Sequence, residues 1–114
     1  MQLLCAIIQK VEVVPQIVSS LMENGLGDPT VINCEGAMHL LESSNIEPPP
    51  LFGALRHLYS PAPHKAKLLV IVLPDEKIQQ AEDLIDEELG GIENPNTGIF
   101  FAMPISHVKG LANK

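Results

Sequence analysis

Two lysines stand where an irregular, proline-containing segment runs into a strongly apolar one. The stretch SPAPHKAKLLVIVLPDE, residues 60–76, places Lys65 and Lys67 directly before that apolar run, in a chain with only seven Lys and Arg residues. A lysine at the start of a strand can bind a phosphate group when turns nearby add backbone N–H donors. The candidate turns are Gly90–Gly91 and residues 96–98 (NTG). The alternative is that Lys65 keeps an edge strand soluble.

Other candidates for chemistry are weaker. The sequence has no phosphate-binding loop motif, no nucleophile elbow and no metalloprotease helix motif, so we expect no enzyme activity. His39, His57 and His64 fall in or beside the irregular segment and are candidate ligands for zinc or copper. None has a partner at helical spacing, so exposed loop histidines are the alternative interpretation. We therefore predict no metal site.

Composition limits the function classes. A chain of 114 residues is expected to form one domain. Its net charge of −7 argues against binding to the phosphate backbone of nucleic acids. Cys5 and Cys34 each sit in an apolar run and form no disulfide framework, which favours a reducing, cytoplasmic location. No apolar run reaches the roughly 18 residues of a membrane-spanning helix, and no signal peptide is apparent, so we expect no membrane insertion.

The first third of the chain alternates between strand and helix patterns. Residues 2–8 (QLLCAII) read as a buried strand. A helix follows, with Pro15 in its first turn and Gly25 at its end. Its apolar face is predicted to hold Val14, Ile17, Val18, Leu21 and Met22. Residues 30–35 (TVINCE) predict a second strand.

The middle of the chain has no sustained period. Five prolines fall between Gly36 and Pro63, and loops of this length inside a compact domain are usually functional or disordered. We treat residues 37–62 as an insertion. Its many apolar side chains predict a protein-binding surface, or alternatively a segment that folds back on the core.

The last part repeats the strand–helix–strand pattern. Residues 67–73 (KLLVIVL) predict a strand, and a helix follows with Asp75 as its N-cap and Gly90–Gly91 as its end. Its apolar stripe is Ile78, Ala81, Leu84, Ile85 and Leu89. Residues 99–105 (IFFAMPI) predict the last strand.

This order predicts a ferredoxin-like βαββαβ sandwich of the α+β class, with an antiparallel sheet and a long loop between strands 2 and 3. The strands are apolar without polar alternation, so both sheet faces need cover. Two helices can cover one face. We expect another copy of the same sheet to cover the other.

These segments resemble the P-II nitrogen regulatory proteins. MQLLCAII with the helix after it, GLGDPTVINCEG, PHKAKLLVIVLPDE and NTGIFFAMPI are similar to the family's successive elements, and the match covers nearly all of the chain except residues 37–62. The resemblance implies a homotrimer, adenine-nucleotide binding (ATP, ADP or AMP) in clefts between subunits, and a T-loop, here residues 37–62, that docks on a target transporter or enzyme. It also implies that Thr30, Gly36, Lys65 and Gly98 line the ligand site, with Lys65 on phosphate.

The chain departs from the family at several charged positions. Ile99 stands where the family has a lysine, and the family's late pair of arginines is absent. Each lost charge-assisted contact removes roughly 1.5–3 kcal/mol from triphosphate binding. The hypothesis is a non-catalytic P-II-like regulatory protein that binds a small ligand. The alternative is a CutA-like trimeric metal-binding protein that uses the loop histidines.

Overall fold

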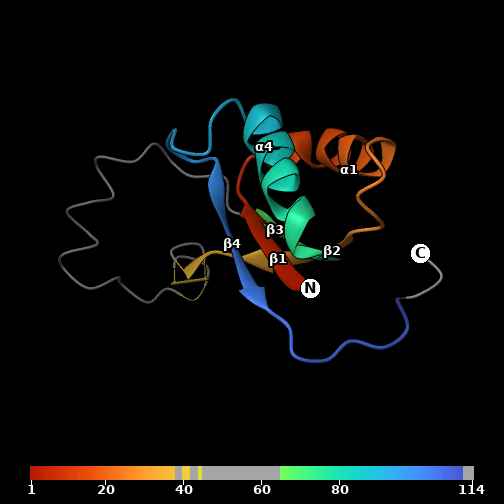
Figure 1. The fold of residues 1–114 in the computed structure, drawn as a ribbon. Helices are drawn as coiled ribbons and strands as arrows, with labels where there is room; N and C mark the ends of the chain where they lie inside the picture. The colour runs from red at the N-terminus through yellow and green to blue at the C-terminus, as the bar shows by residue number, and fades with distance from the viewer. Residues whose placement is uncertain (38–39, 42–43, 45–64, 112–114) are drawn as a thin grey trace.

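The computed structural model describes residues 1–37, 40–41, 44 and 65–111 (Figure 1). The insertion predicted at residues 37–62 lies mostly outside these described residues. His39, His57 and His64 lie outside them entirely.

The centre of the fold is a four-stranded antiparallel sheet in the order β2-β3-β1-β4. Its strands are β1 (Gln2–Ile8), β2 (Thr30–Glu35), β3 (Lys65–Leu73) and β4 (Gly98–Pro104). β1 and β2 have the predicted bounds, and the apolar runs that predicted β1 and β3 occupy the two central positions. Neighbouring strands pair the backbone of each central strand on both edges, while its apolar side chains project alternately from the two faces of the sheet.

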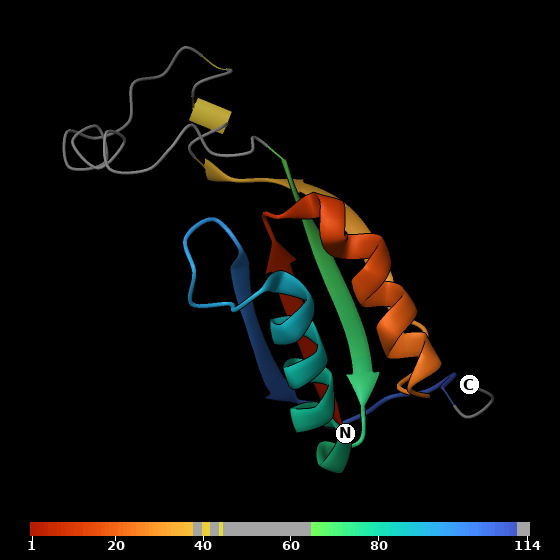
Figure 2. The same cartoon turned by 90° about the horizontal axis from the view of Figure 1, so that it is seen from above.

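Two helices lie side by side on one face of the sheet (Figure 2). They are α1 (Val14–Glu23), after a 3-10 turn at Val11–Val13, and α4 (Ile78–Leu89), after a 3-10 turn at Asp75–Lys77. Pro15 lies in the first turn of α1, as predicted. Gly90 ends α4 in the left-handed conformation with φ 75°, which glycine adopts without steric cost.

Two details of the predicted helices are wrong. Asp75 does not cap α4, because a 3-10 turn precedes the helix and no side chain caps either element. The Asp75 carboxylate instead forms an ion pair with the Met1 amino group at 3.1 Å. Met22 was expected on the buried face of α1 but is 53% exposed, because the core contacts stop at Leu21 on that last turn.

The hydrophobic core fills the space between the helices and this face of the sheet. Every second residue of the central strands points into it, and both helices contribute an apolar stripe. The core residues from these elements are Leu4, Ala6 and Ile8 of β1, Leu69, Ile71 and Leu73 of β3, Val14, Ile17 and Leu21 of α1, and Ile78, Ala81, Ile85 and Leu89 of α4. Leu84, also expected in the stripe, is half-buried against this cluster.

The opposite face of the sheet, which we call the open face, carries neither helix. Strand register places twelve apolar residues and one threonine on it. They are Leu3, Cys5 and Ile7 of β1, Thr30, Ile32 and Cys34 of β2, Ala66, Leu68, Val70 and Val72 of β3, and Ile99, Phe101 and Met103 of β4. Exposure is greatest on the edge strands, with Ile99 at 56% and Ile32 at 47%. The apolar second face expected from the sequence is therefore present.

The architecture is a small α+β fold with an antiparallel sheet and two helices, compatible with the ferredoxin-like class. Among the described residues, no helix is both long enough and apolar enough to cross a bilayer.

Candidate functional site

Three of the four predicted ligand-binding residues lie at one end of the sheet, which we call the lysine end. Lys65 is the first residue of β3 and pairs with Glu35, the last residue of β2. Gly36 follows Glu35 directly in the chain, so it lies beside Lys65. Gly98 begins β4 and pairs with Ile8, whose partner on the other side is Lys67. Two strand spacings separate Lys67 from Gly98, roughly 10 Å. The lysine end therefore brings together glycine backbone and two lysines from three strands.

Thr30 lies elsewhere in the same protomer. It begins β2 and pairs with Val70, five residues along β3 from Lys65, which corresponds to roughly 16 Å. Its side chain shares the open face with Val70, whereas Lys65 and Lys67 are on the face that carries the helices. One protomer therefore does not bring all four predicted residues into one site.

Gly98 is required by the close approach of β1 and β4. Its φ is 147°, and a Cβ atom there would lie 2.3 Å from the main-chain oxygen of Ile7. No side chain fits without moving backbone. The glycine thus lets the loop before β4 join the sheet directly beside the end of β1.

The loop between α4 and β4 is held by its own polar groups. The buried Thr97 hydroxyl donates to the carbonyl oxygens of Ile92 (2.9 Å) and Asn94 (2.8 Å), sharing one proton between them. The Thr97 carbonyl accepts from the amide of Gln9 at 2.9 Å and from that of Lys10 at 3.4 Å. Thr97 therefore fastens the loop to the end of β1.

The Gly90–Gly91 turn does not supply free donors as the sequence suggested. The Gly90 amide donates to Glu87 O at 3.1 Å, and the Gly91 amide donates to Asp86 O at 2.9 Å. These bonds satisfy the last carbonyl groups of α4. The Asp86 carboxylate also accepts from the amide of Ile92 at 2.7 Å. This turn is a helix cap, and donors for a ligand must come from elsewhere.

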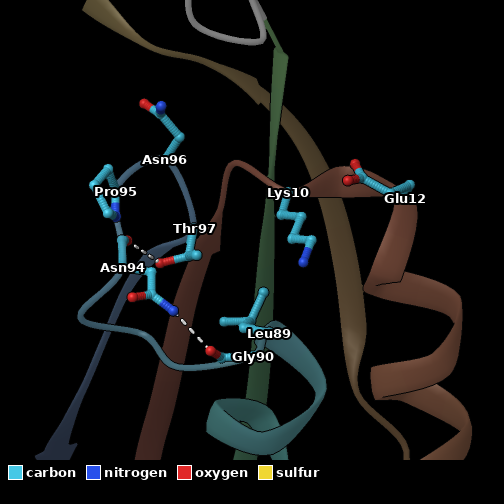
Figure 3. Close-up of a pocket in the computed structure, with 8 residues that line it drawn as sticks. All are labelled: Lys10, Glu12, Leu89, Gly90, Asn94, Pro95, Asn96 and Thr97. Atoms are coloured by element: carbon cyan, nitrogen blue, oxygen red, sulfur yellow. Dashed lines mark hydrogen bonds between the residues drawn. The ribbon is translucent and has the colours of Figure 1, made fainter. Parts of the chain in front are cut away.

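A hollow of about 410 Å³ opens beside this loop on the helix side of the lysine end (Figure 3). The segment after β1 forms one wall with Lys10 and Glu12, and the end of α4 forms the floor with Leu89 and Gly90. The other wall is Asn94, Pro95, Asn96 and Thr97. The Asn94 amide bonds to Gly90 O at 2.7 Å, so this wall is tied to the floor.

Lys10 and Glu12 were missed by the sequence reasoning. In Figure 3 the Lys10 side chain extends toward Leu89. The Glu12 carboxylate points toward Lys10. No ion pair joins either charge to another described residue. The available signal was a cation and an anion two residues apart, directly after a buried strand.

The cysteines and histidines give no second centre in the described part of the chain. Burial raises the pKa of the Cys5 thiol, which disfavours its thiolate at neutral pH. Cys34 is half-buried on β2. Within the described ranges no three His, Cys, Asp or Glu side chains are placed to hold a metal ion. The metal-binding alternative rests on histidines outside these ranges and stays a prediction.

No known protein-family model matches this chain, and no curated protein matches it.

Proposed function

We propose that this chain is a non-catalytic, P-II-like regulatory protein. Copies of it assemble into a homotrimer through the open face. A small phosphate-bearing ligand, an adenine nucleotide, binds in the clefts between subunits. Residues 37–62 then act on a target transporter or enzyme.

The observation that carries this proposal is the open face. Ten of its twelve apolar side chains, all but the buried Cys5 and Ala66, are at least partly exposed. Spread over four strands, they are too continuous for a surface left in water. Each large side chain that becomes buried contributes roughly 1.5–3 kcal/mol. The open face of a second copy is equally apolar. Self-association therefore buries these side chains without requiring a different protein.

The position of Thr30 supports a site shared between copies. Within one protomer Thr30 lies on the open face, at the end of β2 that is remote from Lys65. In an assembly built on that face, the Thr30 of a neighbouring copy can approach the lysine end. Lys65, exposed at the start of β3, supplies the charge for a phosphate group.

Calorimetric titration with ATP, ADP, AMP and cyclic nucleotides tests the ligand. Wild type is expected to bind at least one of them, and Lys65→Ala is expected to weaken that binding by roughly 1.5–3 kcal/mol, about ten- to a hundredfold. Lys77→Ala removes the same charge from the 3-10 turn beyond the opposite end of β3 and is expected to leave binding unchanged. If wild type binds none of these nucleotides at millimolar concentration, the nucleotide proposal is overturned.

A further inference from the structure

The hollow beside Thr97 has two opposite charges on one wall, and neither forms an ion pair within the described part of the chain. Lys10 is half-buried and Glu12 is exposed, and no ion pair joins them to each other or to another described residue. With respect to residues 1–37, 40–41, 44 and 65–111, both charges are available to a ligand.

We propose that this hollow binds a small zwitterion, a free α-amino acid. The Lys10 ammonium holds the ligand carboxylate, and the Glu12 carboxylate holds the ligand ammonium. The site is separate from the nucleotide site proposed above, because it needs neither Lys65 nor a second copy of the chain.

The end of α4 favours positive charge at the floor of the hollow and so stabilises the Lys10 ammonium that reaches toward it (Figure 3). The helix ends at Leu89–Gly90 on the floor of the hollow. A helix C-terminus carries a partial negative charge, which favours a cation nearby. Asp86, Glu87 and Glu88 in the last turn strengthen this field. Lys10 is the one cationic side chain among the residues that line the hollow, so the anionic end of a ligand has a defined place.

Size and polarity fit the same ligand class. The volume of about 410 Å³ lies near the small end of the range for ligand pockets, roughly 300–1,000 Å³. The lining is mixed, with polar Asn94, Asn96 and Thr97 beside apolar Leu89 and Pro95. The loop wall is held in place by Thr97 and Asn94, so little ordering is needed when a ligand enters.

The experiment is calorimetric titration of the full chain with each of the twenty protein amino acids at millimolar concentration. We expect at least one to bind. The best ligand is then compared with two analogues, one lacking its carboxylate and one lacking its ammonium; for L-valine these are isobutylamine and 3-methylbutanoic acid. Loss of either group is expected to weaken binding by roughly ten- to a hundredfold.

Matched variants assign the two charges. Lys10→Met and Glu12→Gln are each expected to weaken the same binding by roughly ten- to a hundredfold. Lys77→Met and Glu76→Gln make the same chemical changes in the 3-10 turn at the other end of α4 and should leave binding unchanged. Lys65→Ala should also leave it unchanged, which separates this site from the nucleotide site. Three results overturn the proposal: no amino acid binds, binding survives both Lys10→Met and Glu12→Gln, or the amine binds as tightly as its amino acid.

Discussion

A Cβ atom on Gly98 would lie 2.3 Å from the carbonyl oxygen of Ile7, well inside van der Waals contact. The two residues belong to the edge strand β4 and the central strand β1, and the contact lies at the lysine end. It fixes how closely the loop before β4 approaches the strand that leads to Lys10.

Replacing this glycine is therefore expected to destabilise the fold. Gly98→Ala places a side chain at φ 147° and against backbone, so the free energy of unfolding should fall by on the order of 3 kcal/mol or more. The measurement is urea denaturation followed by circular dichroism. Gly25→Ala is the control, because Gly25 also has positive φ (68°) but nothing within 4 Å of its Cβ position. It should cost only about 1–2 kcal/mol. Equal losses in the two variants would contradict the steric argument.

The Thr97 hydroxyl is expected to stabilise the loop that forms one wall of the hollow. Thr97→Val keeps the shape but leaves the carbonyls of Ile92 and Asn94 without their donor, so unfolding free energy should fall by roughly 1–3 kcal/mol. Thr97→Ser keeps the hydroxyl and should retain most of that stability. Hydrogen exchange of the loop amides, measured by NMR, gives a local test: faster exchange is expected in the valine variant. Unchanged amide exchange rates and an unchanged free energy of unfolding would show that the Thr97 hydroxyl does not stabilise the loop.

Strands were predictable because their signal is local. The apolar runs of β1 and β3 carry no polar alternation, and a strand covered on both faces requires that pattern. The same pattern predicts the apolar residues of the open face. Gly90 was predictable too, because a glycine after an amphipathic stripe marks a helix end.

The site was only partly predictable because its contacts join distant segments. Asp75 was expected to cap α4, since nothing in the sequence shows that the Met1 amino group arrives beside it. The hollow likewise combines the end of β1, the end of α4 and the loop before β4. Lys65 and Gly98 could be chosen from the sequence. That Thr30 lies far from Lys65 follows from the antiparallel pairing of β2 and β3, which places the start of β2 toward the end of β3.

The Met1–Asp75 ion pair predicts a small acid dependence of stability. The hydrogen bond from the Met1 amino group, its positive charge and a hydrogen bond from Gln2 together lower the pKa of the Asp75 carboxyl from its ordinary 3.8. The pKa is lower in the folded than in the unfolded state, so the stabilisation is present above 3.8 and is lost as pH falls through the folded value. The pair is exposed, so the effect is modest.

The test compares wild type with Asp75→Asn in urea denaturation between neutral pH and about pH 2.5. The wild type should be the more stable protein at neutral pH, and the difference should shrink at the acid end. Glu76→Gln is the control at the neighbouring exposed position. A difference between wild type and Asp75→Asn that stays constant with pH would contradict the ion-pair explanation.

The open face predicts that assembly is sensitive to a charge on β4. Light scattering should give wild type a mass near three times 12.4 kDa. Phe101→Glu places a carboxylate in the middle of an edge strand of the open face, where association would strip it of water, so this variant should be monomeric. Met22→Glu makes a similar change at an apolar residue on α1 that is 53% exposed and outside the open face. It should remain trimeric.

The folded state of both variants is checked by circular dichroism, since neither side chain is in the core. A wild type that is monomeric at micromolar concentration would remove the assembly and the intersubunit site together, whereas a trimer that survives Phe101→Glu would place the contact on another surface.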